Sequence, residues 1–494
     1  MVRNQHSIPA WLHAEREKEW VACRKTLEAL AQRARLQKLL AFPLTDAGNA
    51  EVFAEEHGTR FRYDHTRQKW RVWNGRYWAA DETGESDRAA LETARVRQMA
   101  AMLINDPDLR NEHVDWALHT ESTYSRRAML TSAQSIEQLA TTAADYDHDP
   151  FLLTVGNGTL DLTTGELRDF RPGDLITRAT DVVYSESAEC PRWLRFLDEI
   201  FAGDRQLINF VSRAVGYSLT GDTREQCLFI LHGGGANGKS TFLETLLRLV
   251  GTHAAITSFS TFLVHQNPGA PRNDLAKLHG ARLVKAAESQ KQAALDEATV
   301  KEATGGDTMS ARYLYQEYFD FRPQFKIWLT TNHLPDIRGT DDAIWRRIHL
   351  IPFKQQFTGK SCDSKLRNKL ERELSGILAW AVRGCLEWQR AGLGAASVVK
   401  AATLDYRRES DQVARFLKER CSRRADDQAS GHELYEAYSQ WCSDRGEKPE
   451  SNNTFPKRLA EHGIGKKRTQ KGRVYNGVGL KEQPRAKLIG GDQS

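Results

Sequence analysis

The chain has 494 residues, of which 27% are charged and 40% hydrophobic, and a formal net charge of +5. This length is enough for several domains with their own cores, and the mild positive charge suits a polyanionic partner without requiring one. The seven cysteines are scattered and form no C-x-x-C pair, which argues against a zinc finger or a disulfide framework. No apolar run approaches the ~20 residues of a membrane span and no signal-peptide core follows the N-terminus, so we expect a cytoplasmic protein without a membrane partner.

The N-terminal forty residues predict an amphipathic helix or helix pair. Trp20, Leu27 and Leu30 recur at helical spacing among many charged side chains between residues 9 and 40. Such an apolar face either packs against the next domain or contacts another subunit, and the sequence does not choose between the two.

The following region alternates short strands and helices. Aromatic side chains flank Asn74-Gly75, a strong hairpin-turn signal. Arginines among these aromatics suit stacking of single-stranded nucleic acid, but aromatics at strand spacing more often form a small core, which is the interpretation we favour. The acidic run Asp145–Asp149 is interpreted as a solvated loop rather than a metal site. Helices are expected at 46–56, 82–144 and 191–220, and a further β element at 152–167.

A glycine-rich segment is the most specific motif of the chain. Gly233 to Ser240 fits G-x-x-x-x-G-K-[ST], preceded by an apolar strand at 227–231 and followed by a helical pattern at 241–250. Glycines let polyphosphate lie against backbone N–H groups, and the helix start adds positive potential. We therefore predict an ATP site formed by Gly233, Gly234, Gly235, Ala236, Asn237, Gly238, Lys239, Ser240 and Thr241. Lys239 would reach the β- and γ-phosphates, and the Ser240 hydroxyl would hold Mg²⁺.

Two further strands are predicted to end beside this loop. Residues 281–288 end in Glu288, a carboxylate suited to hold the Mg²⁺ water shell or to polarise an attacking water. Lys285 within that strand is expected at a sheet edge or toward solvent. Residues 325–332 end in Asn332, which can orient the water and sense the γ-phosphate, or can simply begin a turn.

Arg346 and Arg347 stand together ahead of another apolar strand. An arginine supplied by a neighbouring subunit can stabilise charge in a phosphoryl-transfer transition state. The alternative is a pair of surface arginines, and the sequence does not say which of the two would act.

Taken together, these segments resemble the superfamily 3 helicases, in particular the helicase half of the phage and plasmid primase–helicases related to the poxvirus primase–helicase. The resemblance is carried by residues 233–241, 282–288, 301–315, 331–335 and 339–347, with flanking segments 45–50, 157–162 and 409–417. It implies an α/β fold: an AAA+-type P-loop core, with helices on both faces of a parallel sheet, between a mainly helical N-terminal region and a C-terminal winged-helix module.

The resemblance also implies an activity. It points to a hexameric ring that hydrolyses ATP and moves along single-stranded and forked DNA, in replication of a phage, plasmid or integrated element in a bacterial host. It assigns catalysis to Lys239, Glu288, Asn332 and Arg346 or Arg347, with Ser240 and Glu288 as magnesium ligands. Residues 301–317 would form the pore hairpin that grips DNA. Its expected contacts are Lys301, Arg312 and Tyr315, while Gln316 replaces a lysine found in many relatives.

Family members often carry a primase domain, but we find no paired carboxylates or zinc motif for primer synthesis. We therefore predict no primase activity, and a separate primase or an origin-binding protein as a possible partner.

The C-terminal region predicts three helices followed by a basic hairpin between residues 410 and 479, an order that suggests a winged-helix module. Tyr435, Tyr438 and Trp441 are assigned to its core. Cations gather on the third helix and the hairpin, and we favour DNA contact over a solvated basic face. These cations are Lys457, Arg458, Lys466, Lys467, Arg468, Lys471 and Arg473.

We divide the chain into a helical extension, a pre-helicase α/β region, an ATPase core, a helical segment on the core, a winged-helix-like DNA-binding domain and a tail. The boundaries are 1–45, 46–195, 196–355, 356–408, 409–482 and 483–494. The leading hypothesis is an ATP-dependent DNA helicase. The alternatives are an origin-binding initiator whose ATPase does not unwind DNA processively, and a DNA-binding regulator with a vestigial ATPase.

Overall fold

The structure is a computed structural model that describes residues 10–264, 272–287, 294–312, 317–337, 339, 341–359, 362–469 and 472–481. The chain divides into two compact units, Met1–Tyr184 and Ser185–Ser494, each of which is described by itself. Within the described ranges, no helix combines the length and the apolar character that crossing a membrane requires.

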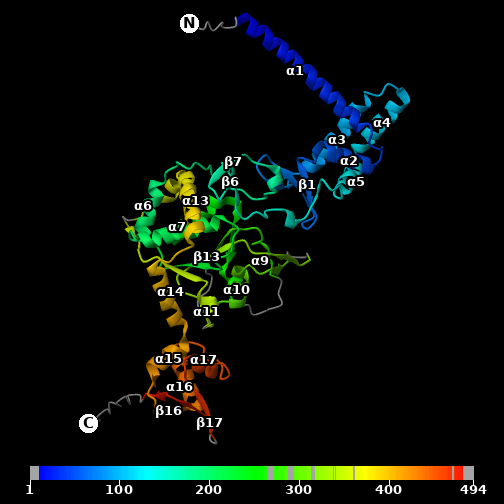
Figure 1. The fold of residues 1–494 in the computed structure, drawn as a ribbon. Helices are drawn as coiled ribbons and strands as arrows, with labels where there is room; N and C mark the ends of the chain where they lie inside the picture. The colour runs from blue at the N-terminus through cyan, green and yellow to red at the C-terminus, as the bar shows by residue number, and fades with distance from the viewer. Residues whose placement is uncertain are drawn as a thin grey trace, which may run out of the picture. The chain divides into compact units, whose positions relative to one another are not determined.

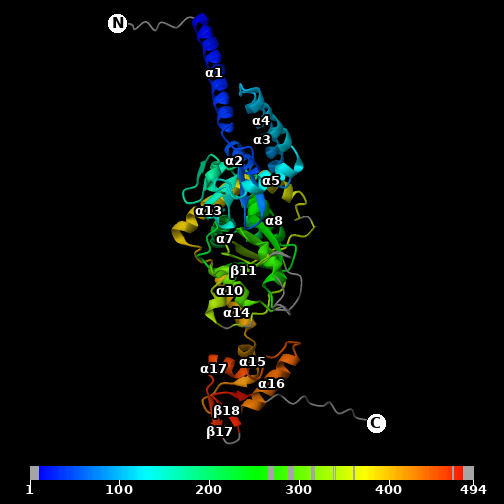
Figure 2. The same cartoon turned by 90° about the vertical axis from the view of Figure 1, so that its right-hand side faces the viewer.

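The first unit begins with one long helix, α1 (Ala10–Leu39), which is dark blue in Figure 1 and Figure 2. Its C-terminal end packs in a small cluster in which Leu39, Val52 and Ala100 are buried. Further toward the N-terminus, the described side chains of α1 include three exposed large apolar ones, Val21, Leu27 and Leu30. Packing within the unit therefore accounts for the last turns of the helix, and the subunit contact stays an untested alternative for the rest.

Four helices and two small sheets complete this unit. The helices are α2 (Asp46–His57), α3 (Glu85–Ala101), α4 (Pro107–Thr120) and α5 (Thr123–Ala133), with 3₁₀ turns η1 (Ala143–Asp145) and η2 (Pro172–Asp174). One sheet has the order β3-β2-β1-β4, and its strands are β1 (Phe61–Asp64), β2 (Lys69–Trp73), β3 (Trp78–Ala80) and β4 (Ala140–Thr141). The other is the antiparallel sheet β5 (Leu152–Val155), β6 (Gly158–Asp161) and β7 (Glu166–Arg168).

The aromatic segment forms the predicted hairpin and contributes to a core. β2 pairs antiparallel with β3, and Gly75 in the connecting turn has a φ of 91°, which favours glycine. Phe61 and Trp78 have no exposed surface (0%), so the core interpretation is confirmed for them.

The second unit is built on a parallel sheet. Its strands are β8 (Leu228–His232), β9 (Ala254–Ser258), β10 (Leu283–Ala287), β13 (Lys326–Thr331) and β14 (Ile348–Pro352), in the spatial order β14-β8-β13-β10-β9. β10 lies between β9 and β13, so Lys285 is half-buried inside the sheet and the expected edge position is wrong.

Helices cover both faces of this sheet, as predicted. They are α6 (Pro191–Ile200), α7 (Arg205–Leu219), α8 (Lys239–Val250), α9 (Asn273–Ala276), α10 (Glu297–Gly305), α11 (Asp342–Trp345), α12 (Leu366–Arg372), α13 (Leu374–Ala391) and α14 (Ser397–Ser410), with η3 (Gly251–His253) and η4 (Phe259–Phe262). On one face Phe229 and Trp328 meet Phe210 of α7 and Phe242 of α8. On the other face the buried side chains come from the sheet, α10 and α14, including Ile230, Leu329, Val300 and Tyr406.

Helix α13 packs closely along α7, and the two lie side by side in yellow and green in Figure 1. A Cβ atom on Gly216 of α7 would lie 2.1 Å from the backbone nitrogen of Cys385, so only glycine allows this approach. Elsewhere in the unit, β11 (Met309–Ala311) and β12 (Phe319–Phe321) form a separate antiparallel pair.

Residues 412–481 form a small region that we call the C-terminal module. It contains α15 (Gln412–Arg420), α16 (Gly431–Ser443) and α17 (Phe455–Glu461), with β15 (Cys421–Ser422), β16 (Gln428–Ser430), β17 (Lys466–Thr469), β18 (Gly472–Asn476) and β19 (Gly479–Leu480). The three helices and the β17–β18 hairpin follow the predicted order. Tyr438 and Trp441 are 0% and 1% exposed, and Tyr435 packs against the same cluster, so their assignment to the core is confirmed.

Candidate functional site

The glycine-rich loop connects the buried strand β8 to helix α8. Gly235 and Gly238 have φ values of 89° and 87°, which favour glycine, and Ala236 also has a positive φ of 47°. A Cβ atom on Gly238 would lie 2.7 Å from Cγ2 of Ile200, because α6 packs directly against this turn. The turn is therefore packed tightly against α6 at the start of α8, the end of a helix whose main-chain N–H groups favour an anion.

Lys239 is held in this loop by three oxygen atoms. Its Nζ donates to the backbone oxygen of Gly233 at 2.5 Å, to Oδ1 of Asn237 at 3.2 Å and to Oδ1 of Asn332 at 3.1 Å. The residue is only 6% exposed, and burial lowers the pKa of its ammonium group below the usual value. A cation that has lost water and is held by neutral oxygens is well prepared to meet a phosphate.

Strand β13 brings Asn332 to the loop, as its predicted role requires. β13 lies directly beside β8, with Thr331 paired in register with His232, so the carboxyl ends of both strands meet at one edge. Burial lowers the pKa of His232 at the end of β8, and the charge of Lys239 acts in the same direction. The expected water-orienting amide is therefore in contact with the expected phosphate-binding lysine.

The two expected magnesium ligands have different outcomes. Ser240 is exposed in the first turn of α8, and Thr241 beside it is half-buried. Glu288 lies outside the described residues, which include β10 as far as Ala287. Among the described residues, no group of three or more His, Cys, Asp and Glu side chains is arranged to hold a metal ion.

The adjacent arginines after α11 have opposite surroundings. Arg347 is 7% exposed, and its guanidinium donates to Oγ1 of Thr304 at 3.1 Å and to the backbone oxygen of Ala343. Burial, followed by the charge of Arg346, lowers the pKa of Arg347. Arg346 is exposed and donates to Oε1 of Gln226 at 2.9 Å. Of the two, Arg346 is the one that presents its charge to the surface.

The expected DNA-gripping stretch is split between a helix and a hairpin. Lys301 lies in α10 and pairs with Asp341 at 2.9 Å, so its place on the hairpin is wrong. Arg312 directly follows β11, and its guanidinium lies over the ring of Tyr318 at 4.8 Å. Tyr318 is 59% exposed and was not singled out from the sequence, since a lone tyrosine after an arginine-containing turn gives little signal. Tyr315 and Gln316 lie outside the described residues.

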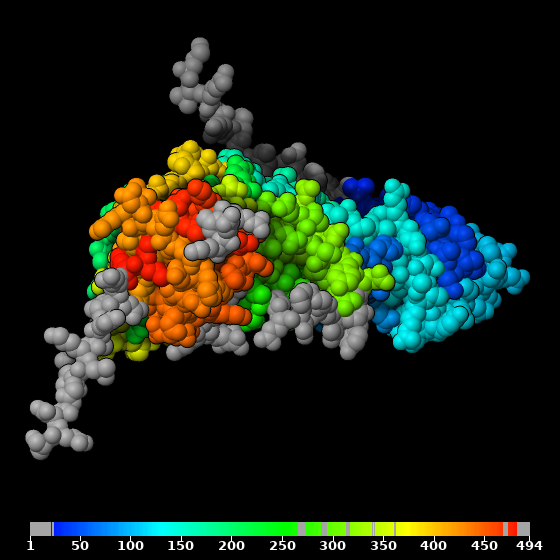
Figure 3. All heavy atoms as spheres, turned by 90° about the horizontal axis from the view of Figure 1, so that it is seen from below, coloured from blue at the N-terminus to red at the C-terminus, as the bar shows by residue number. Residues whose placement is uncertain are grey.

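The expected DNA-contacting cations of the C-terminal module are mostly exposed on its surface, which is orange to red in Figure 3. Lys457, Lys466, Lys467 and Arg473 are exposed, whereas Arg458 is half-buried and pairs with Glu461 at 3.0 Å. Arg468 lies in β17, where its side chain is not described, and Lys471 lies outside the described residues.

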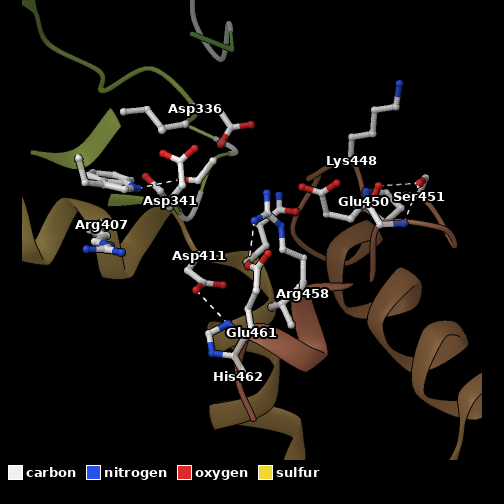
Figure 4. Close-up of a pocket in the computed structure, with 18 of the residues that line it drawn as sticks. Asp336, Asp341, Arg407, Asp411, Lys448, Glu450, Ser451, Arg458, Glu461 and His462 are labelled. Carbon is white, nitrogen blue, oxygen red and sulfur yellow. Dashed lines mark hydrogen bonds and ion pairs between the residues drawn. The ribbon is translucent and has the colours of Figure 1, made fainter. Parts of the chain in front are cut away.

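A separate cavity of about 930 Å³ lies where α14 meets α15, away from the glycine-rich loop. Figure 4 shows that most labelled side chains around it are charged. Asp411 and His462 point toward each other at its edge, with 3.0 Å between Oδ2 and Nε2. Arg407 pairs with Asp342 at 2.8 Å. The cavity residues are thus engaged mainly with one another, and none of them belongs to the glycine-rich loop.

Comparison with known proteins matches three segments of the chain to protein families. Residues 50–202 match the family described as D5 N terminal like, residues 231–347 match a family of unknown function, and residues 408–478 match the family described as Poxvirus D5 protein-like. The two D5-like segments thus lie on either side of the segment that contains the glycine-rich loop.

Individual relatives agree with these matches. The chain is 28% identical over 295 residues to "Putative helicase L207/L206" of Acanthamoeba polyphaga mimivirus, covering 55% of this chain and 31% of the relative. It is 26% identical over 307 residues to "Putative helicase 121R" of Invertebrate iridescent virus 3, covering 55% and 32%. The chain therefore spans about a third of the length of the curated relatives it matches. Both are viral proteins, and the expected bacterial host stays a prediction.

Among solved structures, the chain is similar to the A form apo structure of the NrS-1 C terminal region, with a TM-score of 0.45 and 10% identity, covering 85% of this chain and 96% of that chain. The predicted resemblance is confirmed by the two segments that match D5-like families and by the relatives from large DNA viruses, which are named putative helicases.

Proposed function

We propose that the protein is an ATP-dependent DNA helicase that works as a hexameric ring in the replication of a mobile element. The observation that carries this proposal is the position of Lys239. Its ammonium group is buried in a glycine-rich loop between a parallel strand and a helix, and it contacts Asn332 from the adjacent strand at 3.1 Å. This arrangement fits ATP hydrolysis, because phosphate binding and water orientation are brought together at one sheet edge.

The residues of the glycine-rich loop would bind the phosphates of ATP. Backbone N–H groups from residues 233–241 and the Lys239 ammonium would surround the β- and γ-phosphates. Mg²⁺, held by Ser240 and by Glu288 through its carboxylate, would neutralise charge on those phosphates. Asn332 would orient the attacking water, since its amide already lies within hydrogen-bond distance of Lys239.

The strand order supports an AAA+-type core. The strand that leads into the loop, β8, lies between β13 and β14, and the two remaining strands follow on the β13 side. Such cores complete the site of one subunit with an arginine from the next. Arg346 suits this role better than Arg347, because Arg347 is 7% exposed and bound within its own chain.

Two regions support DNA as the partner. The hairpin β11–β12 presents Arg312 beside the exposed ring of Tyr318, a pair that suits stacking on an unpaired base. We propose that the C-terminal module is a winged-helix domain that contacts the DNA backbone through Lys457, Lys466, Lys467 and Arg473.

Strand displacement tests this proposal. Wild-type protein is expected to unwind forked DNA with ATP and Mg²⁺, whereas Lys239→Ala protein is expected to lose both unwinding and ATP hydrolysis. Circular dichroism and thermal unfolding would establish that the variant is folded. Unwinding by folded Lys239→Ala protein would contradict the site assignment.

The exposed cations of the C-terminal module favour one second candidate, an origin-binding initiator whose ATPase controls assembly only. This candidate predicts sequence-specific binding to duplex DNA and ATP hydrolysis without strand displacement. Electron micrographs with an ATP analogue and forked DNA would separate the two, because a helicase ring encircles one strand whereas an initiator assembles on duplex.

A further inference from the structure

Asn237 makes two different hydrogen bonds from a buried position. The residue is 3% exposed. Its Oδ1 accepts from the Lys239 ammonium at 3.2 Å, and its Nδ2 donates to the backbone oxygen of Phe353 at 3.3 Å. Only an amide of this length supplies an acceptor and a donor at these two points, because aspartate has no donor and alanine has neither.

The partner of this amide belongs to a segment that runs along the loop. Residues 353–357, which we call the backing segment, follow β14. The N–H of Phe353 donates to the backbone oxygen of His232 at 2.8 Å, and the N–H of Phe357 donates to that of Ala236 at 2.7 Å. A Cβ atom on Gly233 would lie 2.3 Å from the Phe353 oxygen. The loop is therefore fixed to the backing segment at its start, beside His232, and in its middle, at Ala236.

Within this arrangement Asn237 connects the backing segment to the reactive ammonium. Lys239 has three N–H donors, and they are shared among Gly233, Asn237 and Asn332. An arriving phosphate, which carries full negative charge, would replace one neutral oxygen, while the other two continue to direct the ammonium group.

We propose that Asn237 is a positioning residue for Lys239, which fixes the ammonium group relative to the backing segment before and during ATP hydrolysis. This inference rests on the proposed ATPase function. It makes the asparagine a specific requirement of the site rather than one of several interchangeable loop residues. Asn237 itself need not touch the nucleotide, since its contacts are with Lys239 and Phe353.

The test compares Asn237→Ala and Asn237→Asp with the wild type by measuring ATP turnover, the Kd of a fluorescent ATP analogue and thermal unfolding. Asn237→Ala is expected to lower kcat by about tenfold or more and to change Kd by less than about threefold, because it misdirects Lys239 without removing a nucleotide contact. Asn237→Asp keeps the acceptor but loses the donor and adds a negative charge beside the phosphates. It is expected to weaken Kd by about tenfold.

Asn49→Ala provides a matched control. Asn49 is equally buried, at 0% exposure, and its amide also bonds on both sides, to Thr120 at 3.0 Å and from Trp116 at 3.1 Å, but it lies in the first unit. Its replacement is expected to lower Tm and to leave kcat and Kd unchanged. This separates general destabilisation from loss of positioning.

Two results would overturn the inference. Asn237→Ala protein with wild-type kcat would show that Lys239 needs no such support, and so would a loss of kcat equal to that of Asn49→Ala at the same loss of Tm. Folded wild-type protein that does not bind ATP would overturn the proposed function as well. If the wild type hydrolyses ATP and the Asn237→Ala variant has the same kcat, only the positioning role is overturned and the proposed function stands.

Discussion

The parallel-sheet region and the C-terminal module use their cations in opposite ways. In the sheet region Lys239, Lys326 and Arg347 are 6%, 1% and 7% exposed, and each is held by oxygen atoms of the protein. In the module Lys457, Lys466 and Lys467, which are expected to contact DNA, are exposed. Buried cations with fixed acceptors are suited to one position and one ligand geometry, whereas exposed lysines suit a diffuse polyanion.

Lys326 is the most deeply buried of these three cations. Its ammonium group donates to the backbone oxygens of Asp222 at 3.1 Å and Gln324 at 3.3 Å, and it lies 4.7 Å from the centre of the Tyr217 ring. Burial lowers the pKa of Lys326 to about 7, and the charge of Arg282 acts in the same direction. It stands at the start of β13, at the opposite end of that strand from Asn332, so burial alone does not mark a residue of the site.

The largest effect is expected from the two adjacent arginines. Arg346→Ala should lower ATP turnover of the assembled protein by about 10³-fold while leaving Tm unchanged, because an exposed guanidinium that completes a neighbouring site is worth roughly that factor. Arg347→Ala should instead lower the free energy of unfolding by about 2–4 kcal/mol, since it removes a buried guanidinium together with its bonds to Thr304 and to the backbone oxygen of Ala343.

Mixing two inactive variants tests whether Arg346 acts in the site of a neighbouring subunit. Arg346→Ala and Lys239→Ala subunits, each inactive alone, should recover part of the turnover when mixed, because some sites then combine an intact loop with an intact arginine. Loss of turnover in Arg347→Ala at an unchanged Tm would instead identify Arg347 as the acting residue.

The second effect concerns the shape of the loop. Gly238→Ala should weaken ATP binding by about tenfold to a hundredfold, because the added Cβ would lie 2.7 Å from Ile200 in a backbone conformation with a φ of 87°. Gly446→Ala is the matched control, since its φ is 68° but nothing lies within 4 Å of the added atom. Both should lose stability through backbone strain, and only Gly238→Ala should lose affinity. Equal ATP affinities would contradict the role of close packing by α6.

The sequence predicts the strand and the helix on either side of the glycine-rich loop well, because their signals are local. The apolar run before the loop became β8 and the periodic segment after it became α8, within one or two residues. The position of Asn332 beside the loop also followed, since strand ends of a parallel sheet meet at one edge, although its contact with Lys239 was not predicted. The sheet order itself could not be derived, because nothing local records which strands become neighbours.

The sequence also could not predict which charged side chains are buried, because burial depends on which elements become neighbours. Arg346 and Arg347 are adjacent and chemically identical, and it is tertiary packing, including the contact of Arg347 with Thr304 in α10, that distinguishes them. Lys285 was expected at a sheet edge or toward solvent, yet β10 pairs with β9 as well as with β13 and is not an edge strand. Lys301 was assigned to the hairpin by the family resemblance, whereas in the structure it lies in α10, which ends at Gly305.

A smaller effect is expected from the exposed cations of the C-terminal module. Lys466→Ala with Lys467→Ala should reduce the slope of log affinity against log salt for duplex DNA by about 0.9 for each phosphate that the protein no longer neutralises. The matched control is Lys365→Ala with Lys400→Ala, which removes the same charge from exposed positions outside the module. Fluorescence anisotropy over a range of salt concentrations measures the slope. Equal slopes in the two double variants would argue for non-specific attraction by net charge.

The smallest expected effect is a pH dependence of the stability of the C-terminal module. The hydrogen bond that His462 donates to Asp411 raises the pKa of the histidine above its usual value, outweighing burial, while Arg423 opposes the shift and Glu461 supports it. Burial alone would raise the pKa of Asp411, but the bonds from His462 and from the Ala414 N–H lower it. A raised histidine pKa stabilises the folded state fully below the unfolded value of about 6.5, and that stabilisation is lost as pH rises through the folded pKa.

The carboxylate contributes on the other side, since its stabilisation is lost only as pH falls below its unfolded value of about 3.9. Above about pH 6.5 the slope that this pair contributes therefore comes from the histidine. Because both side chains are partly exposed, at 24% and 18%, the change should stay below about 1 kcal/mol. Hydrogen exchange of residues 412–481 in the full-length protein measures it. Asp411→Asn keeps the cap on Ala414 but removes the charge, so its protection should not vary across this range. A slope equal to that of the wild type would mean that His462 titrates without help from Asp411.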